Sequence, residues 1–320
     1  MIDQKHKSLF SARQRKTLIF SLVLTAGAYL SVVILTGYDD IQIAFTQIGF
    51  LGWGLLLSCS FASYLIRFIR WQGYIKASGT TVPVVRHFLY YLAGFALTTT
   101  PGKAGETIRS ILLRPHGVSY PSSLASFFTE RFLDVIVIAL LASLSVFIFD
   151  NYTEFVLLSA AIILAVIPFL RSQLLTSLIL MIHNKLNWEK VKTASSHLLS
   201  LIQAAQLFLT WPRIFTGLSL GFLAWIIQGL AFYFIVSTLN VELGLLAAMG
   251  IYSISLLAGA VSFIPGGVGS TEVVMGLLLS ALGADTSVAV SAPLISRLST
   301  LWFAVALGLL SSTWLSSQHK

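Results

Sequence analysis

Long apolar stretches separated by short polar segments dominate the chain. A helix needs about 20 mostly apolar residues to cross a hydrocarbon core of roughly 30 Å. By this measure, six stretches predict full membrane crossings: Leu18–Thr36, Gly49–Ile66, Ser123–Phe149, Phe155–Leu170, Ile214–Ser237 and Val288–Leu310. The pattern therefore predicts an all-α integral membrane fold, in which residues 1–320 form a single polytopic domain.

Two further apolar stretches, Val84–Leu113 and Leu243–Leu282, are interrupted in the middle by a Pro-Gly element. Proline removes a helical hydrogen bond, and backbone that leaves the helix at membrane depth must be buried in protein or line a wet cavity. Both stretches are therefore expected to be re-entrant helical hairpins, each entering and leaving the membrane on one side.

The composition indicates whether the protein surface faces lipid or water. Hydrophobic residues make up 56% of the chain and charged residues 10%, too few charges to cover a soluble globule, so most of the surface must face lipid. The one cysteine, Cys59, lies in an apolar stretch and is interpreted as a packing residue. The first apolar run is too long for a signal-peptide core and is expected to remain as the first helix.

Basic and acidic residues fall on opposite sides of the predicted topology. The basic N-terminal segment shares its side with most other lysines and arginines, whereas the opposite loops carry acids: Asp39, Asp40, Asp150, Glu154, Glu242 and Asp285. Because cytoplasmic loops are enriched in Lys and Arg, both termini are expected in the cytoplasm. The formal net charge of +8 thus follows from topology, and a nucleic-acid partner is not expected.

Two basic segments have alternative interpretations. Residues 171–213 mix apolar and basic positions, so they form either interfacial helices on the cytoplasmic surface or a soluble helical linker. Arg67, Arg70 and Trp71 follow the second apolar stretch. They are interpreted as an interfacial anchor with snorkelling arginines, and contact with substrate is the alternative.

The two interrupted stretches are copies of one another. Pro101–Glu106 reads PGKAGE, and Pro265–Glu272 reads PGGVGSTE. When the two glutamates are aligned, a Leu-Leu pair, a glycine and an arginine recur in the same register, and the arginine follows the glutamate by 25 residues in both copies. Each repeat is expected to comprise a hairpin and the helix after it, residues 84–149 and 243–315.

The copies are predicted to have opposite orientations. Three crossings, starting at Ser123, Phe155 and Ile214, separate the hairpins, and an odd number places the two entrances on opposite sides. Inverted repeats with broken helices allow many transporters to build one central site that opens to either side in turn.

The hairpin tips and the helices after them supply the candidate site. Glycines allow close backbone approach, and a helix that starts after them attracts an anion such as phosphate through its free N–H groups. The residues expected to bind substrate are Lys103, Gly102, Gly105, Glu106, Arg131, Gly266, Gly267, Gly269, Glu272 and Arg297. The glutamates alternatively cap those helix starts, and Lys103 either binds a headgroup or lies in cytosolic water.

Charges inside membrane spans are costly unless they are paired. Arg131 and Arg297 are therefore predicted to approach the hairpin tips, where they either neutralise Glu106 and Glu272 or coordinate a phosphate.

A second pair of carboxylates lies on the helix of the first repeat. Glu130 and Asp134 are one helical turn apart and share a face, so they are assigned an ion-pair or proton-handling role. The second copy has Ser296 and Thr300 at these positions, which predicts an asymmetric site. No metal-ligand spacing, nucleotide loop or nucleophile triad is found in the sequence, so neither a metal, a cofactor nor enzyme activity is expected.

These motifs carry a family resemblance. At Pro101–Glu106, Glu130–Asp134, Pro265–Glu272, Arg297 and Arg67–Trp71, the sequence resembles the lysylphosphatidylglycerol synthase transmembrane-region family, also called flippase-like membrane proteins. The resemblance covers nearly the whole chain and implies a bacterial or archaeal inner-membrane protein that moves or presents lipids. In bifunctional relatives this region flips aminoacylated phosphatidylglycerol made by a fused synthetase domain. This chain ends soon after its last span and is expected to be a stand-alone member.

The preferred hypothesis is a lipid flippase or lipid transporter that moves an anionic or isoprenoid-linked headgroup across the cytoplasmic membrane. Its partners would be membrane lipids that bear phosphate. Two alternatives remain open at this point: an intramembrane transferase acting on a lipid-linked substrate, and a proton-coupled transporter of a small anion.

Overall fold

The described part of the chain folds into helices. The computed structural model describes residues 38–100, 106–147, 189–262 and 264–318, together with isolated positions at 27 and between 154 and 181. The regular elements within these ranges are all helical, and three helices are long and apolar enough to cross a membrane: Ile41–Ala77, Trp211–Thr238 and Thr286–Ser317. The all-α class is therefore confirmed. The predicted spans Leu18–Thr36 and Phe155–Leu170 lie largely outside the described residues.

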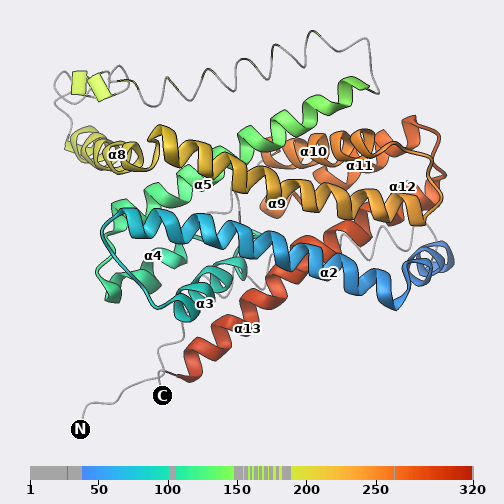
Figure 1. Ribbon diagram of the computed structural model, residues 1–320, viewed down its shortest axis with the longest axis horizontal. Coiled ribbons are helices and arrows are strands. Elements are labelled where there is room, and N and C mark those ends of the chain that lie inside the picture. The colour runs from blue at the N-terminus through green and yellow to red at the C-terminus, as the bar shows by residue number, and fades with distance from the viewer. Residues whose placement is uncertain are drawn as a thin grey trace.

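Two long helices lie side by side at the centre of the fold (Figure 1). α2 (Tyr38–Ala77) bends at Gly49, whose φ of 66° is a conformation that glycine adopts without steric cost. α9 (Trp211–Thr238) packs along α2. Because α2 continues past Ile66 to Ala77, Arg67–Trp71 lie within the helix and not at its end.

The first repeat is a helix, an interruption, a short helix and a long helix. α3 (Val84–Phe95) is followed by turns to residue 100, and Pro101–Gly105 lie outside the described residues. The chain continues through four elements: α4 (Ile108–Leu113), η2 (Arg114–His116), α5 (Tyr120–Ala142) and η3 (Ser143–Phe147).

The second repeat has the same order of elements. α10 (Leu245–Val261) ends before η5 (Pro265–Gly267), and α11 (Ser270–Ala281) follows. The long helix is then built from α12 (Thr286–Arg297), the π-helical turn η6 (Leu298–Trp302) and α13 (Phe303–Ser317). The interruption in this copy falls at the Pro-Gly element, as the sequence predicts.

Each repeat packs its first helix against the long helix of the other repeat. α3 of the first repeat packs against α13 of the second, and α10 of the second packs against α5 of the first. The α3–α13 approach is close, because a Cβ added at Gly308 would lie 2.2 Å from the backbone nitrogen of Ala96. These contacts bring the two interruptions toward the same part of the molecule.

α8 (Glu189–Phe208) lies within the basic segment 171–213. It packs along α5 and buries Ala204 and Phe208 in a small apolar cluster with Leu133. Figure 1 shows α8 beside α5, at the edge of the α2–α9 pair. This helix therefore belongs to the packed fold.

Candidate functional site

Three charged residues on α5 form the centre of the site. Glu130 and Asp134 are 0% and 3% exposed, respectively. The Nη2 atom of Arg131 lies 3.1 Å from Glu130 Oε1 and 3.4 Å from Asp134 Oδ2. Since ionised groups buried in a low-dielectric interior cost several kcal/mol each unless they are compensated, this cluster requires further partners.

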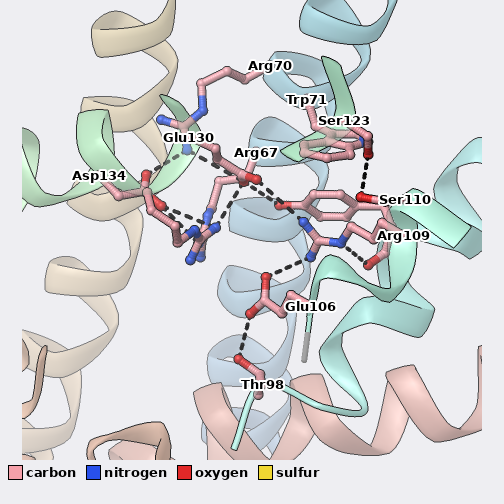
Figure 2. A network of polar contacts seen from close by, with 12 residues as sticks. Arg67, Arg70, Trp71, Thr98, Glu106, Arg109, Ser110, Ser123, Glu130 and Asp134 are labelled. Atoms are coloured by element: carbon pink, nitrogen blue, oxygen red, sulfur yellow. Dashed lines mark hydrogen bonds and ion pairs between the residues drawn. The ribbon is translucent and has the colours of Figure 1, made fainter. Parts of the chain in front are cut away.

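Two of those partners come from α2 (Figure 2). Arg70 Nη2 lies 2.6 Å from Asp134 Oδ1, and Arg67 Nη2 lies 3.1 Å from Asp134 Oδ2. Trp225 of α9 adds a third donor, with its Nε1 3.2 Å from Asp134 Oδ1. The interpretation of Arg67 and Arg70 as a snorkelling interfacial anchor is therefore wrong, because both guanidinium groups are buried and ion-paired.

Trp71 is also part of the interior. It is 1% exposed, and its Nε1 donates to Nε2 of His87 on α3 over 2.9 Å. The Arg67–Trp71 segment thus joins α2 to two other elements, α5 through the arginines and α3 through the tryptophan.

Glu106 has a different arginine partner from the one predicted. Its Oε2 lies 3.0 Å from Nη2 of Arg109, and its Oε1 accepts a hydrogen bond from the hydroxyl of Thr98 over 2.7 Å. Of the two alternatives predicted for Arg131, direct pairing with Glu106 is not seen, since no ion pair joins these two side chains in the described part of the chain. Arg109 is three residues from Glu106 and lies on the same side of the chain, whereas Arg131 is held by the carboxylates of its own helix.

Arg109, on the short helix α4, links the first repeat's interrupted segment to α5. Its Nη1 lies 3.4 Å from Glu130 Oε2, its Nε donates to the carbonyl of Tyr91, and its guanidinium stacks 4.0 Å from the Tyr91 ring centroid. Gly94 makes room for it, since a Cβ there would lie 2.4 Å from Arg109 Nε. Sequence reasoning missed Arg109. Its spacing of three residues from Glu106 is the signal that could have identified it.

The first-repeat network has more positive than negative charge. Within the described residues it contains four arginines (Arg67, Arg70, Arg109 and Arg131) and three carboxylates (Glu106, Glu130 and Asp134), a formal excess of +1. A buried cluster with one surplus positive charge favours an anion, because an anionic ligand would compensate that charge.

The second repeat forms the predicted pair. Arg297 Nε lies 3.1 Å from Glu272 Oε1, and Arg297 Nη2 donates to the carbonyl of Gly266 at the Pro-Gly interruption. Glu272 Oε2 accepts from the N–H of Gly269 over 2.8 Å, so this glutamate also caps the start of α11. The carboxylate therefore satisfies the N–H of Gly269, which is the role of helix cap that the sequence analysis gave as the alternative for this glutamate.

The glycines of this interruption have positive φ angles: 66° at Gly266, 66° at Gly267 and 86° at Gly269. Residues with a Cβ are strained in this region, so glycine is required for the tight path. At Gly267 space is limiting as well, because a Cβ would lie 2.8 Å from Thr271 Oγ1. The equivalent candidates of the first repeat, Gly102, Lys103 and Gly105, lie outside the described residues.

The two repeat arginines line one cavity. Its volume is about 260 Å³, and its lining includes Arg131 and Asp134 of the first repeat together with Gly266 and Arg297 of the second. A smaller cavity of about 70 Å³ also borders Arg297 and includes Arg67 and Glu106. Residues separated widely in sequence therefore share one polar interior.

The two interruptions also approach each other. A Cβ added at Gly266 would lie 3.5 Å from the Cα of Thr99, which precedes the first Pro-Gly element. Among the described residues, no three His, Cys, Asp or Glu side chains gather so as to hold a metal ion. The chemistry of this site is therefore that of guanidinium groups, carboxylates and exposed backbone.

Comparison with known proteins places this architecture in a family. Residues 18–308 match the model of the lysylphosphatidylglycerol synthase TM region. A UPF0104 membrane protein of Pyrococcus horikoshii is 25% identical over 319 residues, covering 91% of this chain and 92% of the relative. A UPF0104 membrane protein of Methanothermobacter thermautotrophicus is 23% identical over 273 residues, covering 78% of this chain and 81% of the relative. The chain therefore belongs to the lysylphosphatidylglycerol synthase transmembrane-region family.

Proposed function

We propose that this protein moves lipids with an anionic headgroup across the cytoplasmic membrane, without a covalent step. The headgroup passes through the cavity between Arg131 and Arg297, and the hydrocarbon chains remain in the bilayer. The supporting observation is that both repeat arginines line one cavity of about 260 Å³. Ligand pockets in proteins commonly start at about 300 Å³, so this cavity is suited to a compact headgroup rather than to a whole lipid.

The charge of the cavity supports an anionic substrate. The first-repeat network has a formal excess of +1, and Arg297 adds a second guanidinium at the cavity wall. Nε and Nη2 of Arg131 have no hydrogen-bond partner among the described residues, although Nη2 lies close to two carboxylates. Guanidinium groups bind phosphate through paired N–H donors, so a phosphate fits this wall better than a neutral headgroup does.

The repeated order of elements supports alternating access. In this proposal the two interrupted segments are re-entrant hairpins that enter from opposite sides, with both termini in the cytoplasm. The reciprocal α3–α13 and α10–α5 contacts are those expected if two halves rock against each other around one site. The membrane potential supplies about 2.3 kcal/mol per charge per 100 mV, which is sufficient to bias the movement of a monoanionic headgroup.

The family supports a lipid substrate. The name of the matching model refers to a synthase of lysylphosphatidylglycerol, a phosphate-bearing lipid, and to its membrane region. We infer that this chain acts on lipids of that chemical kind, and the arginine-lined cavity is the place where their shared feature, the phosphate, would bind.

The test is a flip assay in proteoliposomes that contain the purified full-length chain. Fluorescent phosphatidylglycerol and fluorescent phosphatidylcholine with identical chains are compared by quenching the outer-leaflet label. We expect protein-dependent flipping of phosphatidylglycerol that falls at least tenfold in Arg297→Gln, whereas Arg86→Gln, at an exposed position, retains the normal rate. Equal rates with and without protein for the anionic lipid would overturn the proposal.

A further inference from the structure

An apolar groove opens beside the polar cavity. It lies between α5 and α8, has a volume of about 400 Å³, and is lined largely by hydrophobic side chains, among them Phe128, Phe132, Leu201 and Ile202. The volume is within the range of about 300–1,000 Å³ that is common for small-molecule pockets. A groove of this kind suits a hydrocarbon chain.

The groove and the polar cavity share two residues of α5. Arg131 and Val135 line both spaces, and they lie one helical turn apart on the same helix. A ligand that fills both spaces therefore has its charged part and its apolar part next to each other at Arg131. That arrangement matches an amphiphile whose phosphate is attached close to its chain, and it does not match a free phosphate ion.

A second apolar groove provides an internal comparison. It lies between α11 and α12, has a volume of about 330 Å³, and has Glu272 in its wall. An anionic headgroup at that groove would face a carboxylate, whereas at the α5–α8 groove it faces the guanidinium of Arg131. Electrostatics therefore favour the α5–α8 groove for the chain of an anionic lipid.

We propose that the α5–α8 groove is the binding site for a hydrocarbon chain of the transported lipid, and that Arg131 holds the phosphate at the boundary between groove and cavity. This inference rests on the proposed function and specifies its substrate class: a lipid whose monoanionic phosphate lies close to its hydrocarbon chains, as in a phosphatidylglycerol. It also assigns α8 a role, because α8 supplies one wall of the chain site.

Photocrosslinking tests this assignment directly. The purified full-length chain in nanodiscs is loaded with phosphatidylglycerol carrying a diazirine in one acyl chain, or with phosphatidylcholine carrying the same chain, and adducts are mapped by peptide mass spectrometry. We expect adducts on α5 and α8 at the groove, at least fivefold more abundant with the anionic probe. Adducts that concentrate on α11 and α12, or that show no dependence on the headgroup, would overturn the assignment.

Two variants separate the role of the groove from the integrity of the fold. Ala205→Phe fills the α5–α8 groove without changing a charge, and Val290→Phe makes the same type of change in the α11–α12 groove. We expect the first to reduce the groove adducts at least fivefold and the second to leave them unchanged. Equal adduct yields in both variants contradict the inference.

The crosslinking result is independent of transport. Groove adducts without flipping would support this chain site while refuting the proposed transport. Flipping of phosphatidylglycerol without groove adducts would retain the proposed transport and refute the chain site. The two experiments together therefore distinguish failure of the inference from failure of the function on which it rests.

Discussion

The two repeats place a glutamate and an arginine in the same register but pair them differently. In the second repeat Arg297 pairs with Glu272 and donates to the carbonyl of Gly266, so it binds the Pro-Gly interruption and the helix after it in its own repeat. In the first repeat Arg131 pairs with Glu130 and Asp134 on its own helix, and Arg109 takes Glu106. The same spacing thus leads to two different ion-pair patterns.

Local competition explains the difference. The second repeat has Ser296 and Thr300 where the first has Glu130 and Asp134, so no carboxylate on α12 or η6 at these positions competes with Glu272 for Arg297. The first repeat also draws in Arg67 and Arg70 from α2. The first repeat therefore contributes a network of several ion pairs to the cavity wall, whereas the second contributes one described arginine–glutamate pair beside its glycine-rich interruption.

The largest expected effect is at Asp134. Asp134→Asn leaves Arg67, Arg70 and Arg131 without their shared buried carboxylate, and breaking a buried ion pair costs about 3–5 kcal/mol. At the equivalent second-repeat position, Thr300→Val removes one hydroxyl hydrogen bond and should cost about 1 kcal/mol. Thermal unfolding of both variants in nanodiscs measures this contrast. Similar losses of stability in the two variants would show that the first-repeat network contributes no more to stability than the equivalent second-repeat position.

The two glutamates that follow the Pro-Gly elements, Glu106 and Glu272, provide the next contrast. Glu106→Gln removes a carboxylate whose side chain is 1% exposed and raises the local excess of positive charge, so we expect a loss of roughly 3 kcal/mol. The side chain of Glu272 is 11% exposed, so Glu272→Gln should lower the free energy of unfolding by roughly 1.5 kcal/mol. The same unfolding measurement ranks them. A larger loss for Glu272→Gln contradicts the view that the first repeat is the structural one.

Adding a first-repeat carboxylate to the second repeat tests the asymmetry. Thr300 lines the small cavity together with Arg67 and Arg297, and Thr300→Asp places a negative charge there. We expect flipping of phosphatidylglycerol to fall about tenfold, equivalent to about 1.4 kcal/mol, because the new carboxylate competes with the headgroup. Thr300→Asn is the control of matched shape. If Asn and Asp variants slow flipping equally, charge is not the cause.

The smallest effects concern the two repeat arginines. Arg297→Lys loses one of two directed contacts, to Glu272 or to Gly266, and should cost about 1 kcal/mol of unfolding free energy. Arg131→Lys keeps a charge near both carboxylates and loses no aligned hydrogen bond within the described residues, so we expect about 0.5 kcal/mol. Denaturant titration of the purified variants compares them. A greater loss of unfolding free energy for Arg131→Lys than for Arg297→Lys would contradict the view that Arg297 makes the more directed contacts.

Several features of this protein follow from the sequence alone. The apolar stretches predict the helical class, and the Pro-Gly elements predict where the second interruption falls. The repeated register identifies Arg297 as the partner of Glu272, and helical spacing places Glu130 and Asp134 on one face. These inferences succeed because each depends on neighbours along the chain or on a pattern that occurs twice.

Only the tertiary structure decides which groups compensate the buried charges. Asp134 is paired with Arg70, 64 residues away, because α2 and α5 meet in space, and Arg109 displaces Arg131 at Glu106 because the short helix α4 brings it closer. A buried carboxylate needs a cationic partner, but the sequence contains several arginines that could take that place. The choice among them depends on distance and burial, which arise only when the helices pack.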